Sequence, residues 1–199
     1  MFQARFHGRG GQGVVTAAEM LSVAAFHEKK HAQAFPMFGS ERMGAPVVSF
    51  CRISDHEIRS REPVLEPDAL IIQDPTLLQT SDLFKGLAPG GVVLINSSRE
   101  LCGLGIDWLL KLLPAGNVLT VPATEIALDH IKRPLPNAAM LGGLAAMSGV
   151  VKLESVLAAI AEILPGAVAK ANIAAAKEAY ENVAANRAGA TNEKVKRAC

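Results

Sequence analysis

The chain has 199 residues, of which 50% are hydrophobic and 20% charged, and its formal net charge is +1. This length and composition are typical of one globular domain. The near-neutral charge gives no electrostatic reason to expect nucleic-acid binding, which depends on clustered Lys and Arg. The longest apolar run, 138–151, is too short to span a bilayer, so we expect no membrane insertion.

Cysteine usage and the N-terminus indicate a cytoplasmic protein. The three cysteines form no C-x-x-C pair and no zinc or iron–sulfur spacing, so we expect reduced thiols. Charged and polar residues at positions 5, 7 and 9 interrupt any secretory apolar core. The cysteines are Cys51, Cys102 and Cys199.

The N-terminal stretch 2–26 predicts a strand, a glycine turn and a helix. Residues 2–7 alternate apolar and polar side chains, and a helix-forming run without Gly or Pro starts at Val14. Glycines let a ligand approach the backbone, and a helix N-terminus attracts anions. We therefore predict an anion-binding turn whose candidate ligand residues are Gly8, Gly10, Gly11, Gln12 and Gly13.

The same glycines match the G-x-G-x-x-G spacing of dinucleotide-binding folds. That fold normally carries an acidic residue at the end of a second strand, about 20 positions further on. Here residues 28–33 read as the polar end of a helix. A nicotinamide or flavin site is therefore the weaker alternative, and a tight strand-to-helix joint is the simpler structural interpretation.

The stretch 31–46 shows neither helical nor strand periodicity but carries two Phe, two Met and two Pro. It is either a loop folded back on its own domain or a contact loop, because aromatic residues, Met and Arg are enriched at interfaces. Its candidate interface residues are Phe35, Pro36, Phe38, Glu41 and Arg42. Glu41 and Arg42 are expected to form a surface pair and not a catalytic site.

Four further strands are predicted, at 47–54, 69–73, 92–96 and 117–122, and 57–59 is a possible hairpin partner of the first. Cys51 is expected to be a small core residue. Asp74 follows the strand 69–73, where open α/β sheets place ligand groups, although a turn or helix-capping role is favoured.

Helices are predicted at 124–131, 138–151, 152–164 and 168–186, followed by a polar, frayed tail at 187–199. Residues 1–186 are thus expected to form a single domain of the α/β class, with three α/β/α layers. The sheet is expected to be mainly parallel, and mixed because of the hairpin-like region at 47–58.

Nothing in the sequence predicts catalysis by this chain alone. The five histidines are scattered and are expected at the surface, and the chain has no G-x-S-x-G turn, no H-E-x-x-H and no P-loop.

Several motifs in order resemble the gamma subunit of 2-oxoacid:ferredoxin oxidoreductases, such as the pyruvate and ketoisovalerate enzymes. The likeness covers about residues 4–185, and Met37 and Met43 depart from the expected loop pattern. The motifs are the glycine turn 8–13, the loop 32–46, Glu66–Asp68, Gln73–Thr76 and Asn137–Gly142.

The resemblance implies a complex that converts a 2-oxoacid and coenzyme A (CoA) to acyl-CoA, CO₂ and reduced ferredoxin. Thiamine diphosphate and iron–sulfur clusters would lie on the alpha, beta and delta partners, while Gly10–Gly13 would lie near a CoA phosphate or the thiamine-bearing partner and 35–42 would form the contact surface. The alternatives are a purely structural subunit, an indolepyruvate-type enzyme subunit, or a free-standing dinucleotide-dependent oxidoreductase.

Overall fold

The computed structural model describes residues 1–37, 43–80 and 82–192. A six-stranded mixed sheet forms its centre, in the order β2-β3-β1-β4-β5-β6. Strands β1, β4, β5 and β6 run parallel, and β3 is antiparallel to its neighbours β1 and β2. The strands are β1 Phe2–Arg9, β2 His31–Met37, β3 Pro46–Ser54, β4 Ala69–Ile72, β5 Val92–Asn96 and β6 Val118–Val121.

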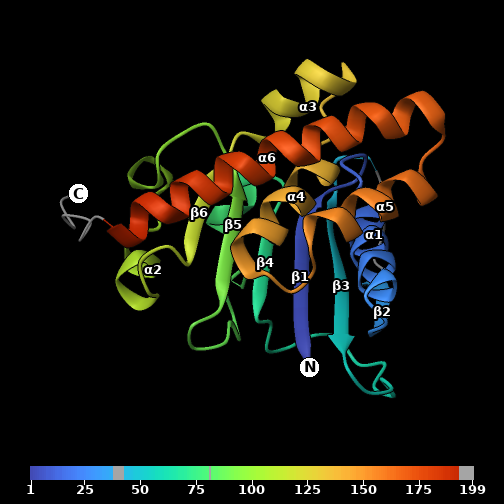
Figure 1. Cartoon of the computed structure of the whole chain (residues 1–199). Coiled ribbons are helices and arrows are strands. Elements are labelled where there is room, and N and C mark those ends of the chain that lie inside the picture. The colour runs from blue at the N-terminus through green and yellow to red at the C-terminus, as the bar shows by residue number, and fades with distance from the viewer. Residues whose placement is uncertain (38–42, 81, 193–199) are drawn as a thin grey trace.

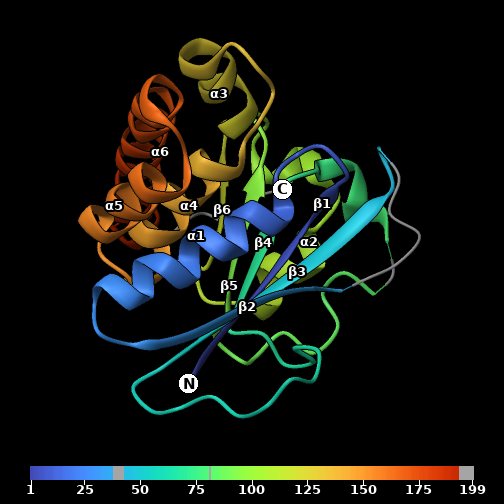
Figure 2. The same cartoon turned by 90° about the vertical axis from the view of Figure 1, so that its right-hand side faces the viewer.

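Helices cover both faces of the sheet, as the α/β prediction requires. In Figure 1 the helices α1, α4, α5 and α6 lie in front of the strands, and Figure 2 shows α2 on the opposite face. The helices are α1 Val14–His27, α2 Asp107–Leu112, α3 Ala123–Ile131, α4 Asn137–Ser148, α5 Leu153–Ile163 and α6 Gly166–Asn192, with 3₁₀ helices η1 Pro75–Gln79 and η2 Leu101–Leu104. None of the described helices is long and apolar enough to cross a bilayer.

The continuous apolar strands β4 and β5 serve two cores at once. Ala69 and Ile71 pack into the core under α1, α4, α5 and α6, whereas Leu70 and Ile72 point to the smaller core on the other face. Successive strand residues point to opposite faces, so a strand covered on both sides must be apolar throughout.

Helix α4 is almost wholly buried between the sheet and α6. Its approach to α6 is so close that a Cβ on Gly142 would lie 2.0 Å from the carbonyl oxygen of Ala176. Only glycine fits at that crossing.

Two predictions about local structure are wrong. The stretch expected to be an aperiodic loop contains β2, and 57–59 form no strand, since β3 pairs with β1 and β2 instead. Pro36 obscures the strand pattern of β2, and an edge strand tolerates a proline because one side of its backbone needs no ladder partner. Helix α6 also continues past its expected end at Asn186, as Ala and Arg support helix there. The division into a domain and a tail at 187 stays a prediction.

Candidate functional site at the carboxyl edge of the sheet

The glycine turn lies between β1 and α1, as the sequence predicts. Gly13 caps α1 with a left-handed backbone, φ 70°, and Gly11 has φ 97°, conformations that favour glycine. A Cβ on Gly8 would lie 2.6 Å from Cγ2 of Val14, and one on Gly13 would lie 2.6 Å from Nδ2 of Asn137. Gly8 and Gly13 are therefore required by the packing of the chain on itself, as a tight strand-to-helix joint.

The turn is bonded to the start of β3, although about 35 residues separate them in the sequence. The backbone N–H of Gly10 donates to the carbonyl of Ala45 at 2.9 Å, and the N–H of Gly44 donates back to Gly10 at 3.1 Å. Met43 is 87% exposed, and its Cε lies near Gly11. The predicted anion-binding turn and the end of the predicted contact loop thus form one surface.

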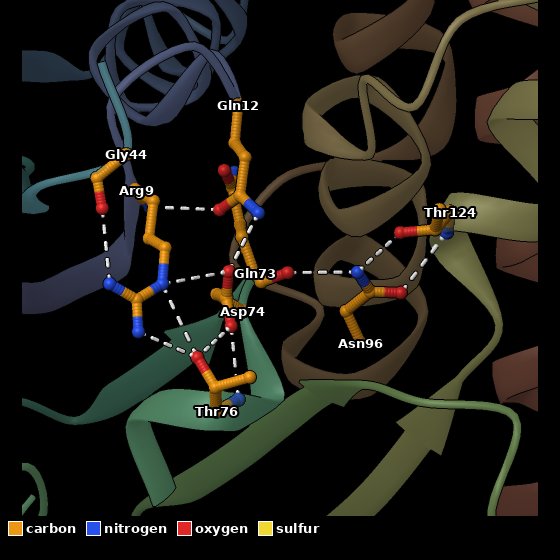
Figure 3. Close-up of polar contacts among 8 residues, drawn as sticks. All are labelled: Arg9, Gln12, Gly44, Gln73, Asp74, Thr76, Asn96 and Thr124. Carbon is orange, nitrogen blue, oxygen red and sulfur yellow. Dashed lines mark hydrogen bonds and ion pairs between the residues drawn. The ribbon is translucent and has the colours of Figure 1, made fainter.

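Asp74 is the centre of the polar contacts at this edge (Figure 3). Its Oδ2 accepts a hydrogen bond from Nε2 of Gln12 at 2.9 Å and lies 3.3 Å from Nε of Arg9, while Oδ1 accepts from the backbone N–H of Thr76 at 3.0 Å. The Gln12 amide also accepts from the N–H of Arg9. Asp74 therefore caps η1, as predicted, and in addition holds the glycine turn.

The Asp74 carboxyl is stabilised in its ionised form. Burial alone would raise its pKa, but hydrogen bonds from the hydroxyl and N–H of Thr76 and from Gln12, with the positive charge of Arg9, together lower it below the ordinary value. The pair with Arg9 is consequently an ion pair at neutral pH.

A second set of hydrogen bonds extends along the same edge toward β6. The amide nitrogen of Asn96 donates to the carbonyl of Gln73 at 2.8 Å and to the hydroxyl of Thr124 at 2.7 Å. Its oxygen accepts from the N–H of Thr124 near the start of α3 (Figure 3). With Asn137 at the start of α4, three helix N-termini meet at this edge of the sheet.

The predicted interface residues are only partly described. Phe35 is half-buried: its ring centroid is 5.2 Å from that of Phe50, and the Arg52 guanidinium lies over it at the same distance. Pro36 follows it in β2. Phe38, Glu41 and Arg42 lie outside the described residues, so the assignment of an interface to this loop stays a prediction.

Arg9, Thr76 and Asn137 were not predicted as site residues. Their positions could have been suspected because each lies at the end of a strand or the start of a helix, and the carboxyl ends of parallel strands meet at one edge. The sequence does not show which of these ends are neighbours.

Two titratable side chains near β1 are shielded from solvent to different degrees: His7 is half-buried, with its Nε2 atom buried, and Cys51 is fully buried. The expectation that all five histidines are at the surface is wrong for His7, whose pKa is lowered to about 3, first by burial and second by the charge of Arg5. Cys51 is a buried free thiol whose pKa burial raises, which confirms a core role.

The comparisons with known proteins agree with the resemblance in the motifs. The family model described as pyruvate ferredoxin/flavodoxin oxidoreductase matches residues 3–182. The chain is 48% identical over 180 residues to the "Pyruvate/ketoisovalerate oxidoreductases common subunit gamma" of Thermococcus kodakarensis, covering 90% of this chain and 96% of that protein.

Solved structures have the same fold. The crystal structure of pyruvate oxidoreductase subunit PORC from Thermotoga maritima aligns with a TM-score of 0.76 and 38% identity, over 90% of this chain and 95% of that chain. The 2-oxoglutarate:ferredoxin oxidoreductase of Magnetococcus marinus, solved with 2-oxoglutarate, CoA and succinyl-CoA bound, aligns with a TM-score of 0.65 over all of this chain and 33% of that chain. At 16% identity this second likeness concerns the fold alone. The chain belongs to the pyruvate ferredoxin/flavodoxin oxidoreductase family, as the gamma subunit of a 2-oxoacid:ferredoxin oxidoreductase.

Proposed function

We propose that this gamma subunit works in the cytoplasm with alpha, beta and delta partners, in a complex that converts a 2-oxoacid and CoA to acyl-CoA, CO₂ and reduced ferredoxin. Its carboxyl-edge surface, defined as the glycine turn 8–13 together with residues 43–46, faces the bound CoA. The observation that carries this proposal is the pair of backbone hydrogen bonds between Gly10 and residues 44 and 45, because they join the predicted anion-binding turn to the end of the predicted contact loop.

The chemistry is assigned to the partners. Among the residues that the structure describes, no group of three or more His, Cys, Asp or Glu side chains could hold a metal ion, so these residues do not fit an iron–sulfur cluster. Thiamine diphosphate and the clusters would supply decarboxylation and electron transfer from the partner subunits. This chain would position the CoA that receives the acyl group.

Placing a negative charge at the glycine turn tests directly whether a CoA phosphate lies there. Gly11→Asp and Gly11→Asn have side chains of nearly the same shape, and both residues tolerate positive φ better than most. If a CoA phosphate lies there, the Asp variant of the assembled complex has a KM for CoA several-fold above that of the Asn variant, with an unchanged KM for the 2-oxoacid. Equal CoA KM values in the two variants would contradict the proposal.

The contact role has a separate test. Met37 is 52% exposed at the end of β2. We expect Met37→Asp to weaken assembly with the partner subunits in size-exclusion chromatography, while Met37→Gln assembles more completely, because a charge at an interface must lose its water. Full assembly of the Asp variant would remove this part of the proposal and leave the CoA part standing.

A further inference from the structure

The Arg9 guanidinium is held in one position at the glycine turn by three residues from two separate segments of the chain. Its Nη2 donates to the hydroxyl of Thr76 at 2.8 Å, its Nη1 donates to the carbonyl of Gly44 at 3.0 Å, and its Nε lies 3.3 Å from the Asp74 carboxylate. Figure 3 shows the guanidinium between these groups. A side chain fixed in this way loses little further freedom when it binds a ligand.

The guanidinium keeps donors for a ligand. A guanidinium carries five N–H groups. Nε and Nη2 each donate one to Thr76, and Nη1 donates one to Gly44. Within the described part of the chain, one N–H on Nη1 and one on Nη2 therefore stay available for a ligand. The side chain is 34% exposed. A planar pair of donors fits the oxygens of a phosphate group.

The surroundings of Arg9 also favour an anion. The first turn of α1 has no acidic residue and no side-chain cap, so no group of the helix itself offsets its partial positive charge. Beside it, Gln73 is fully buried, and neither atom of its amide has a hydrogen-bond partner in the described part of the chain. Figure 3 shows this side chain rising from the end of β4 toward Gln12. A buried polar group without a partner is rare and is often associated with a ligand site.

We propose that Arg9 binds a phosphate group of CoA, and that Asp74 and Thr76 are positioning residues that hold its guanidinium at the turn. The inference rests on the proposed function and adds the residue that supplies the charge. Asp74 lies on the Nε side of the guanidinium, so the unused donors on Nη1 and Nη2 remain available for the phosphate.

The test measures CoA binding to the assembled complex by calorimetry, with Arg9→Gln as the variant and Arg61→Gln as its control. Arg61 is an exposed arginine in the loop before β4, at the opposite edge of the sheet. We expect Arg9→Gln to weaken CoA binding about 10- to 100-fold and to flatten its dependence on ionic strength, with Arg61→Gln unchanged. Unchanged affinity in Arg9→Gln overturns the proposal.

Dephospho-CoA, which lacks the 3′-phosphate, identifies the group that Arg9 contacts. Equal weakening of CoA and dephospho-CoA by Arg9→Gln assigns the contact to the diphosphate, and weakening of CoA alone assigns it to the 3′-phosphate. Asp74→Asn tests positioning: we expect several-fold weaker CoA binding with the steep salt dependence retained. Unchanged CoA affinity in Asp74→Asn removes its positioning role.

If the Arg9→Gln complex does not assemble, Arg9→Lys replaces it, since Lys keeps the charge but lacks the planar fork. Several-fold weaker CoA binding in Arg9→Lys supports the proposal, and unchanged affinity overturns it. The variants Gly11→Asp and Gly11→Asn distinguish CoA binding at the turn from the specific role of Arg9. An effect of Gly11→Asp without an effect at Arg9 leaves CoA at the turn and removes Arg9, whereas no effect at either position removes both.

Discussion

The Nδ2 atom of Asn137 lies 2.6 Å from the position that a Cβ on Gly13 would occupy. This contact joins the first residues of α4 to the glycine turn before α1, 124 residues away in the sequence. It explains why the turn needs glycine at this position even without a ligand: the backbone has φ 70° and the space is already filled.

Gly13→Ala should therefore destabilise the fold by about 2–4 kcal/mol, from the strain of a left-handed backbone plus the clash with Asn137. Gly90→Ala is the matched control, because Gly90 also has positive φ but nothing lies within 4 Å of its Cβ position. It should cost only about 1 kcal/mol. Urea unfolding measures both, and equal losses would show that the Asn137 contact contributes nothing.

Alanine substitutions at two helical glycines should change the stability of the fold in opposite directions. Gly142→Ala places a methyl group on the backbone of α6 and should cost about 3 kcal/mol or more, or prevent folding. Gly189, within α6, has open space around its Cβ position. Gly189→Ala should stabilise the protein by about 0.5–1 kcal/mol, since alanine is the better helix former. Thermal melting should show a lower melting temperature than wild type for Gly142→Ala and a higher one for Gly189→Ala.

His7 should make stability fall as the solution is acidified. Its pKa is about 3 in the folded protein and near 6.5 when unfolded, so protons bind preferentially to the unfolded chain between these values. The contribution of His7 is complete above about pH 6.5 and falls by about 1.4 kcal/mol per pH unit below it. We expect His7→Phe to lose this slope in urea unfolding at pH 4–7, while the exposed His56→Phe keeps it. A parallel slope in His7→Phe would contradict the burial of a neutral imidazole.

Asp74 should contribute stability over a different pH range. Its folded pKa lies below the unfolded value, so its contribution is present above about pH 4 and is lost as pH falls through the folded pKa. Asp74→Asn should be less stable than wild type by about 1–2 kcal/mol at pH 7, and the difference should shrink near pH 3. Asp82→Asn, at an exposed position, serves as the control. A difference that is independent of pH would show that the charge of Asp74 does not matter.

The local elements followed from the sequence where periodicity and composition were unambiguous. The strands 69–73 and 92–96 were recognisable because both faces are covered, and α1 because helix formers follow the glycines directly. Strand β2 was missed because edge strands need neither a full alternation nor every N–H. His7 was expected at the surface, but its burial depends on which elements pack against β1, and the local sequence does not show this.

The sequence by itself determined the α/β class, the glycine turn as the strand-to-helix joint and the family, since each depends on residues close together in the chain or on motifs in a fixed order. Only the tertiary structure decided that Arg9, Asp74, Gly44 and Asn137 meet at one edge. The order of strands is set by long-range packing, and a one-dimensional pattern of residues does not specify which strand ends become neighbours.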